Sequence, residues 1–301
     1  MNKTSQSAQS AQKSSPIMAT NHKAGSVYGR PVPIDNGISV VLADNAKDYT
    51  GPGTNTYVVG DERLWIIDPG PADAAHVAAV ETAIAGRSVD GIFVTHTHLD
   101  HSPAAKPLKA LTGAPVYGSK KLCSKLAALT DEDVDLDFEA DHELSGGETI
   151  GDGKWRIDVL HTPGHFPNHL CYLLPEVGTL FSGDHVMGWS TTVIVPPLGN
   201  LADYLASLTL LEETGATRLL PSHGDAVECA VTRIREVRNH RMMRHAQVGA
   251  CVARGITEPE TIVDMLYDDL TARLIEAARS CVRAHLDMMD EKQPDQELMA
   301  Q

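Results

Sequence analysis

The sequence predicts an α/β layered domain followed by a small helical appendage. Up to residue 225, short segments rich in Val, Ile, Tyr and Trp alternate with helix-like segments. This recurring strand–helix order is typical of layered α/β proteins. After residue 225 no strong β-type run appears, and helical patterns continue to about residue 290. The 301 residues, 42% of them hydrophobic, are sufficient for one large core with a small appendage.

Flanking residues and periodicity place the individual elements. Candidate strands have β-branched and aromatic residues between turn formers, and they span residues 39–43, 56–59, 64–67, 91–95, 155–160, 169–174, 179–182 and 218–221. Asp73 and Asn200 stand as N-caps before helices predicted over 73–85 and 200–214, each with an apolar stripe. Further helical patterns lie at 103–112, 119–129, 257–266 and 268–289.

Composition divides the chain into four segments. Residues 1–24 are rich in Ser, Gln and Ala and lack Asp and Glu, so a disordered tail is expected. A targeting peptide is the alternative, but the segment has no Arg and no apolar stretch of the ~7–15 residues that a secretory signal needs. Residues 25–225 form the expected main domain, 226–290 the helical domain and 291–301 a polar tail.

The charge balance excludes some classes of partner. The chain has 25 basic and 40 acidic residues and a net charge of −15. Because nucleic-acid affinity depends on Lys and Arg that neutralise phosphates, a duplex-coating protein is not expected. No apolar run approaches the ~18–20 residues of a membrane helix, so no membrane partner is expected either. The five cysteines are scattered without a C-x-x-C pair, which favours reduced thiols and a cytoplasmic location.

A high density of metal-ligating residues follows the strand predicted at 91–95. His96, His98, Asp100 and His101 lie within six positions, and imidazole and carboxylate groups are favoured zinc ligands. In an extended chain His96 and His98 point to the same side. Once the chain turns, Asp100 and His101 can reach a neighbouring position. The spacing therefore suits two adjacent ions better than one.

Three later strands also stop at a candidate ligand beside a glycine. In chain order these ligands are His165, which follows a His-Thr-Pro-Gly turn, then Asp184 and His223. Strand ends deliver side chains to one edge of a sheet, and glycine lets the loop turn tightly there. Together with the histidine-rich segment, they predict a single site at one edge of the domain.

This ordered set of motifs resembles the metallo-β-lactamase superfamily. The resemblance covers about residues 38–225, and its motifs include Asp-Pro-Gly at 68–70 and Ser-Gly-Asp at 182–184. It implies a four-layer αβ/βα sandwich in which two sheets lie between helices, with residues 25–225 as the catalytic domain. The segments at 51–57 and 191–204 and the helical tail resemble the lactamase-β-2-like group, whose small C-terminal domain is helical and winged-helix-like.

The resemblance also implies a site with two zinc ions, although His and Asp donors accept Fe or Mn as well. The family pattern assigns the first ion to His96, His98 and His165, the second to Asp100, His101 and His223, and a bridging position to Asp184. In the family such ions lower the pKa of a bound water to ~7 and polarise the scissile bond. Asp100, which orients the attacking hydroxide, and His169, which could face the pocket, are the candidate catalytic residues.

The predicted function is therefore binuclear zinc-dependent hydrolysis of an ester, thioester, amide (including β-lactam) or phosphodiester bond in a small molecule. An aspartate at position 184, where some β-lactamases carry cysteine, resembles glyoxalase II, the nucleases and the lactonases more closely. Some lactamase-β-2-like members cleave single-stranded RNA, which is the alternative function. Residues 218–245, with six Arg as well as His240 and His245, form the one basic stretch, but a solvated helix face with ion pairs explains it more simply.

Two hypotheses from other functional classes compete with the hypothesis of an enzyme. A structural zinc module would need closed coordination, whereas these ligand sets leave room for water. A role in binding a protein partner through the helical tail would add to the catalytic function and would not replace it. The sequence leaves the oligomeric state open.

Overall fold

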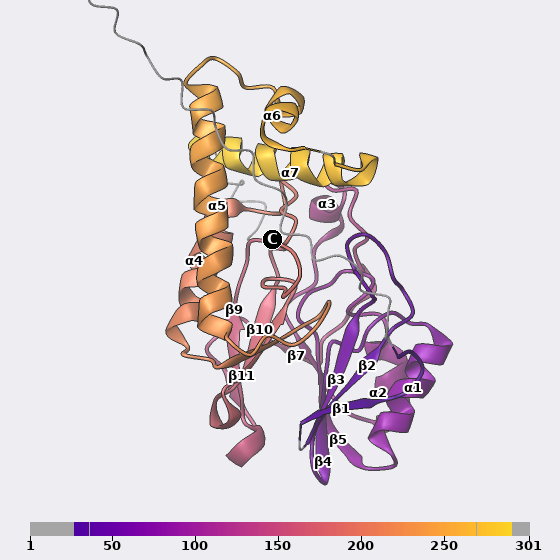
Figure 1. Ribbon diagram of the computed structural model, residues 1–301. Helices are drawn as coiled ribbons and strands as arrows, with labels where there is room; N and C mark the ends of the chain where they lie inside the picture. The colour runs from indigo at the N-terminus through magenta and orange to yellow at the C-terminus, as the bar shows by residue number, and fades with distance from the viewer. Residues whose placement is uncertain (1–26, 36, 269, 291–301) are drawn as a thin grey trace, which may run out of the picture.

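Two β-sheets stack on each other and helices cover both outer sides in the computed structural model (Figure 1), which describes residues 27–35, 37–268 and 270–290. This confirms the predicted α/β sandwich of four layers. The tails expected at 1–24 and 291–301 lie outside the described residues. Within the described ranges, no helix combines the length and the apolarity needed to cross a bilayer.

The first sheet has seven strands in the order of the chain. The first three pairs are antiparallel and the last three are parallel. Parallel neighbours need a crossover, which α1 (Ala74–Ile84) and α2 (Ala105–Thr112) provide. The strands are β1 (Val32–Asp35), β2 (Ile38–Leu42), β3 (Asn55–Gly60), β4 (Arg63–Ile67), β5 (Ser88–Phe93), β6 (Val116–Gly118) and β7 (His142–Glu143).

The second sheet has five strands in the order β12-β11-β10-β9-β8. Its one parallel pair, β11 with β12, is connected through α4 (Leu201–Glu213). A short helix, α3 (Ser124–Ala127), lies in the segment between β6 and β7. The strands are β8 (Thr149–Ile150), β9 (Ile157–His161), β10 (Leu170–Leu174), β11 (Thr179–Gly183) and β12 (Arg218–Pro221).

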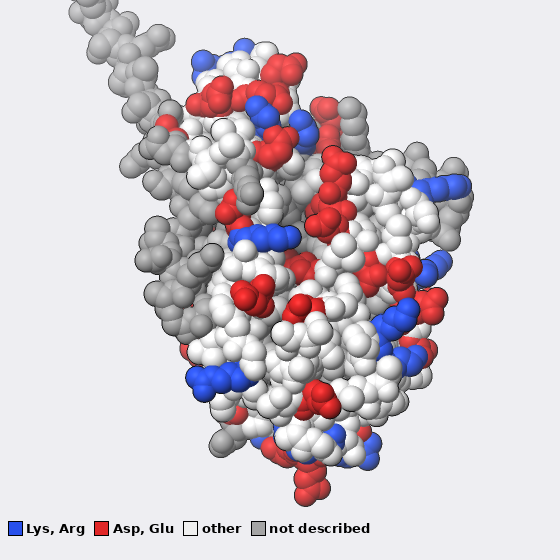
Figure 2. All heavy atoms as spheres, turned by 90° about the vertical axis from the view of Figure 1, so that its right-hand side faces the viewer, with Lys and Arg blue, Asp and Glu red and all other residues white. Residues whose placement is uncertain are grey.

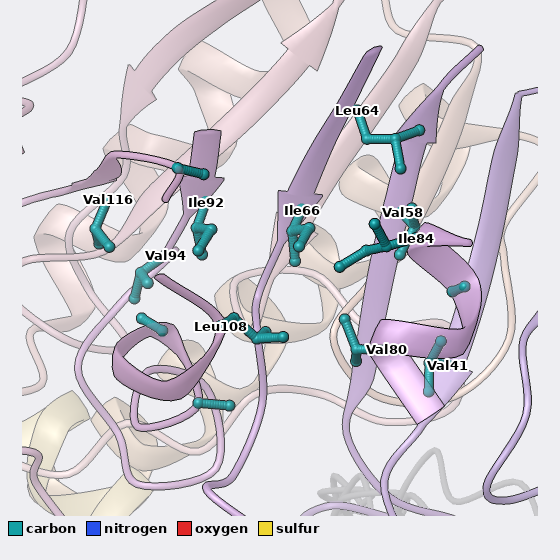
Figure 3. Packing of buried hydrophobic residues seen from close by; sticks show 14 of the residues in the cluster. Val41, Val58, Leu64, Ile66, Val80, Ile84, Ile92, Val94, Leu108 and Val116 are labelled. Atoms are coloured by element: carbon teal, nitrogen blue, oxygen red, sulfur yellow. The ribbon is translucent and has the colours of Figure 1, made fainter. Parts of the chain in front are cut away.

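The central strands are buried on both faces, and alternate residues pack into different clusters. In β3, Tyr57 and Val59 belong to the cluster between the sheets, whereas Val58 packs toward α1 and α2. In β10, Tyr172 points between the sheets and Leu173 packs toward α4. Because successive side chains point to opposite faces and both faces are buried, these strands consist of nearly continuous apolar residues. Figure 3 shows the outer cluster of the first sheet, which includes Val41, Val58, Ile66, Ile92, Val80, Ile84 and Leu108.

Both predicted N-caps are present. The Asp73 carboxylate accepts hydrogen bonds from the backbone N–H groups of Ala75 and His76, each at 3.0 Å. The Asn200 side chain accepts one from the N–H of Asp203 at 2.9 Å. Each cap satisfies amide groups that would otherwise lack a partner in the first helical turn.

The C-terminal part consists of three helices, as predicted: α5 (Ala230–Val252), α6 (Pro259–Leu266) and α7 (Ala272–Met289). In Figure 1, α7 crosses the upper half of α5. The start of α5 shares a core with the sandwich, because Ile234 and Val237 lie in one cluster with Leu208 and Leu219. The far end of α5 forms a separate cluster with α6 and α7. The predicted domain division at residue 226 is therefore crossed by a common core.

The structure contains four short strands that the sequence does not predict, β1, β6, β7 and β8, which are two to four residues long. So few residues cannot show an alternating pattern. The helix expected over 119–129 shrinks to α3, none of whose residues is buried. Without an apolar face to pack against the core, a helix of this length gains little stability.

Candidate metal centre

The predicted metal ligands lie together at one edge of the sandwich. The segment from His96 to His101 follows β5, His165 follows β9 through the Gly164 turn, and Asp184 and His223 follow β11 and β12. Gly164 has φ +136°, and a Cβ there would lie 2.3 Å from the backbone of Tyr204 in α4. Only glycine allows the turn before His165 to pack this closely against the helix.

Three overlapping groups of donor atoms form at this edge, and within each group the atoms lie within 4.8 Å of one another. The groups are His96, His98 and His165; Asp100, His101 and His223; and His96, His101 and Asp184. The first two groups have the membership that the family pattern assigns to two ions. The third group places Asp184 beside His96 of the first group and His101 of the second.

Asp184 lies between the two histidine groups. Its Oδ2 atom is 3.7 Å from Nε2 of His165 and 3.7 Å from Nε2 of His101. Its Oδ1 atom is 3.3 Å from Nε2 of His223. One carboxylate thus reaches donors of both groups, which is the arrangement expected of a bridging ligand.

Hydrogen bonds on the outer side of the rings determine which nitrogen faces the site. The Nδ1–H of His165 donates to the carbonyl of Val193 at 2.8 Å, and the Nδ1–H of His223 donates to the carbonyl of Gly53 at 3.1 Å. A carbonyl only accepts, so each Nδ1 carries a proton, and in the neutral form of each ring the lone pair of Nε2 points into the site. These two rings are fixed in the tautomer that a metal ligand requires.

Asp68 organises the segment that carries the first histidines. Its carboxylate accepts hydrogen bonds from the N–H of Thr95 at 2.8 Å, the hydroxyl of Thr95 at 2.9 Å and the Nδ1–H of His101 at 3.0 Å. The hydroxyl of Ser222, next to His223, donates to it as well. Asp68 is 1% exposed and has φ +50°. The sequence marked it only as part of a turn motif.

The donor set fits divalent cations. Nε2 of His101, Nε2 of His165 and Oδ1 of Asp184 are buried and have no hydrogen-bond partner among the described residues. Leaving such groups unsatisfied costs ~1–3 kcal/mol each, and more where they are charged. A cation at the centre of each group would satisfy them, and imidazole with carboxylate donors suits zinc, iron or manganese.

The charges of the site also favour cations. Burial, followed by the neighbouring His165, lowers the pKa of His98 to about 3, so this ring is neutral at pH 7. Burial by itself would lower the pKa of His223. The negative charges of Asp184 and Asp100 outweigh the effect of burial and raise this pKa to about 10. The same two carboxylates raise the pKa of His101 against its burial. This half of the cluster therefore attracts positive charge.

His169 does not face the pocket. Its side chain has no exposed surface, Nδ1 bonds with the hydroxyl of Thr162 at 2.8 Å, and Nε2 accepts from the N–H of Asp184 at 3.2 Å. The expectation that it could contact a substrate is wrong for this structure, because the ring is fully buried beside Gly183 and Asp184 and does not line the pocket. His169 instead positions the backbone at Asp184.

A pocket of about 780 Å³ opens over the donor groups. Residues from the loops 45–50 and 189–196 line it, whereas no residue of 166–169 does. Two further walls come from segments that the sequence did not connect with the site, namely residues 129–133 and the helices α5 and α7. In Figure 2, acidic side chains gather around a hollow between the C-terminal helices and the sandwich.

Comparison with known proteins identifies the family. The family model described as the metallo-beta-lactamase superfamily matches residues 49–223. A beta-lactamase-like protein 2 homolog of Drosophila melanogaster is 29% identical over 266 residues, which cover 84% of this chain and 87% of that protein. An atrochrysone carboxyl ACP thioesterase of Aspergillus chevalieri is 31% identical over 212 residues, which cover 69% of this chain and 63% of that protein.

A solved structure shows the same fold. The beta-lactamase domain protein from Burkholderia ambifaria superposes with a TM-score of 0.71 over 89% of this chain and 90% of its own, at 21% identity. The high coverage includes the C-terminal helices as well as the sandwich. The chain belongs to the metallo-β-lactamase superfamily of metal-dependent hydrolases, within its lactamase-β-2-like group.

Proposed function

We propose that this protein is a binuclear zinc-dependent hydrolase of acyl bonds, and specifically of thioesters or esters. The observation that carries the proposal is the arrangement of three donor groups joined through Asp184, with buried donor atoms that lack partners. His96, His98 and His165 would hold one ion, Asp100, His101 and His223 the other, and Asp184 both.

The protein's own residues have distinct tasks in this proposal. Cations held in these groups would lower the pKa of water and polarise the oxygen of the scissile bond. Asp100 accepts a hydrogen bond from the Thr54 hydroxyl at 2.9 Å through Oδ2, which leaves Oδ1 to orient the attacking water. Asp68 holds the ring of His101, and His169 holds the backbone of Asp184.

An acyl bond is favoured by the relatives and by the pocket. The Aspergillus chevalieri relative is named a thioesterase, and the pocket has the volume of a small-molecule site, for which ~300–1,000 Å³ is usual. Five cysteines without a disulfide support a reducing, cytoplasmic compartment. Zinc is proposed over iron and manganese as the common partner of such donors.

RNA cleavage has weaker support. Of the arginines in 218–245, Arg233, Arg241 and Arg244 are buried, and Arg235 and Arg238 form ion pairs with Glu212 of α4. The stretch is therefore not an exposed basic face, and its charges are largely engaged within the protein. The stretch is not the solvated helix face expected from the sequence either, because three of its arginines are buried and the ion pairs of Arg235 and Arg238 go to another helix.

Metal analysis and a substrate panel test the proposal. Purified protein should contain close to two zinc ions per chain, and Asp184→Ala should lose both metal and turnover, while Asp264→Ala on the exposed side of α6 should lose neither. The panel should contain a glutathione thioester, a lactone, a β-lactam, a bis-aryl phosphodiester and a short RNA, each with a chelator control. A fully active Asp184→Ala enzyme, or turnover of RNA alone, would refute the proposal.

A further inference from the structure

The helical wall of the pocket contains a buried guanidinium group. Arg241 of α5 is 4% exposed and lines the pocket that holds the donor groups. Its Nη2 donates to the carbonyl of Thr192, and its Nη1 lies 3.6 Å from Sγ of Cys281 in α7. The Nε–H has no hydrogen-bond partner, and no carboxylate of the described residues lies within 4 Å of the group.

An unpaired buried cation is costly. Taking a guanidinium out of water costs several kcal/mol unless an anion and further hydrogen bonds compensate it. The acidic residue that α7 contributes to the pocket, Glu276, is 58% exposed and pairs with Arg279 at 2.9 Å. The charge of Arg241 is therefore not balanced within its own wall, in a chain with a net charge of −15.

The charges of Arg241 and Arg244 also act on the titratable groups beside them. Burial, followed by the charges of Arg241 and Arg244, lowers the pKa of His240 to about 4. Burial and then Arg241 lower the pKa of His285 to about 3. The 129–133 segment lines the pocket with Asp131, Glu132 and Asp133. The pocket is thus positive on the side of the helices and negative on the side of the 129–133 segment.

We propose that the wall built by α5 and α7 is a recognition subsite for an anionic group of the substrate, a carboxylate or a phosphate, with Arg241 as the cation that binds it. Arginine is suited to this task because its planar fork matches both anions. Thr192 connects the subsite to the metal centre, since its carbonyl accepts from Arg241 and its hydroxyl donates to the carbonyl of Asp184. Arg241 and five of the predicted metal ligands line the same pocket, so one small molecule can reach both.

This inference rests on the proposed acyl hydrolysis, so the test compares three thioesters. The pentanoyl thioester of N-acetylcysteamine is neutral, the glutaryl thioester adds a carboxylate at the acyl end, and pentanoyl phosphopantetheine adds a phosphate at the thiol end. One anionic thioester should exceed the neutral one in kcat/KM by about tenfold or more, since a hydrogen bond to a charged group contributes ~1.5–3 kcal/mol. A preference for the glutaryl thioester would place the bound anion at the acyl end of the substrate, and a preference for the phosphopantetheine thioester would place it at the thiol end.

Substitution of Arg241 separates recognition from a merely structural role. Arg241→Met should abolish the preference, so that kcat/KM for the preferred anionic thioester falls by about tenfold more than kcat/KM for the neutral one. Arg241→Lys should retain part of the preference. The control is Arg238→Met on the same helix, whose side chain pairs with Glu212. Equal losses for all three thioesters would mean that Arg241 only holds the loop at Thr192, and would overturn the subsite.

A second measurement does not depend on hydrolysis. Cys281 lies beside Arg241 in the pocket, whereas Cys229 is exposed elsewhere. At each cysteine we compare the rate of alkylation by iodoacetate, an anion, with the rate of alkylation by neutral iodoacetamide. The ratio of the first rate to the second should be about tenfold higher at Cys281 than at Cys229. Arg241→Met should abolish the difference. If the thioesters are not cleaved but this ratio holds, the proposed bond is wrong and the anion subsite stands; equal ratios at both cysteines would refute the subsite.

Discussion

The carboxylate of Glu132 lies 3.6 Å from Nε2 of His98, on the side of the imidazole ring that faces away from His96. Nδ1 of His98 is 2.8 Å from Nε2 of His96, so it is Nδ1 that points into the first donor group. Glu132 is mostly buried, and the hydroxyl of Thr130 donates to its other oxygen at 3.1 Å. A carboxylate behind a metal-ligating histidine orients the ring and raises its basicity.

Glu132→Ala should therefore weaken the binding of one of the two metal ions by roughly 10- to 100-fold. Glu132→Gln should have a smaller effect, because the amide oxygen keeps a partial negative charge beside the ring. Competition with a chromophoric chelator measures both affinities. The matched control is Glu139→Ala, whose side chain is 84% exposed. If both metal sites of the Glu132→Ala variant bound their ions with the affinity of the wild-type protein, the orienting role of Glu132 would be contradicted.

Asp68→Asn should destabilise the fold by ~3–5 kcal/mol, the usual effect of breaking a buried charged pair. The new amide group would face the donors of Thr95, Ser222 and His101, which all point at the present carboxylate. Urea unfolding measures the free energy. Asp90→Asn, which removes the partner of the exposed Arg63, should change it by less than about 1 kcal/mol. Similar small effects for both variants would show that Asp68 is dispensable.

The folded protein should lose stability as the pH falls below 6.5, in part through His285. Its folded pKa is about 3, against an ordinary value of 6.5. The unfolded chain takes up a proton between these values and the folded one does not. The free energy of unfolding therefore falls by ~1.4 kcal/mol for each pH unit below 6.5, down to about pH 3. Above pH 6.5 this contribution is constant.

His285→Gln should make the pH dependence shallower by about that slope between pH 6 and 4, as measured by urea unfolding at several pH values. His142→Gln, at an exposed position in β7, should leave the slope unchanged. If the wild-type protein and His285→Gln lose stability in parallel on acidification, the buried imidazole is not the group responsible.

We propose that residues 226–290 do not fold independently of the sandwich. Deletion of 226–301 would expose Leu208 and Leu219, which share a cluster with Ile234 and Val237, and would remove the bond from Arg241 to the loop of Thr192. The truncated protein should be insoluble or bind less than two metal ions, as sedimentation and elemental analysis can determine. A truncation after residue 290 is the control. A soluble, metal-loaded and active 1–225 fragment would instead establish two independent domains.

The sequence predicts the sandwich well where a strand or helix is marked by its own residues and their immediate neighbours. The strands around Tyr57 and Tyr172 consist of apolar runs between turn formers, and the caps Asp73 and Asn200 precede clear apolar stripes. The two-residue strand β7 pairs with β6 only because the fold brings distant segments together. Such short edge strands carry no periodic signal.

The same distinction applies to the site. Each predicted ligand stands at the end of an apolar strand, so local order along the chain reveals it. Glu132 and Arg241 instead reach the site from a loop and a helix whose own sequences carry no ligand motif. His169 was misplaced because its position beside the His165 turn suggests exposure, whereas its hydrogen bonds to Thr162 and Asp184 bury it.

All donor atoms of the metal centre come from the loops of the sandwich, whereas one wall of the pocket comes from α5 and α7. Reactivity and selectivity are therefore encoded in separate stretches of the chain. Substitutions on the pocket side of these two helices can change which molecules enter without disturbing a single ligand, provided that Thr192 keeps its contact with residue 241. Directed evolution toward new substrates should accordingly begin with residues 240–283.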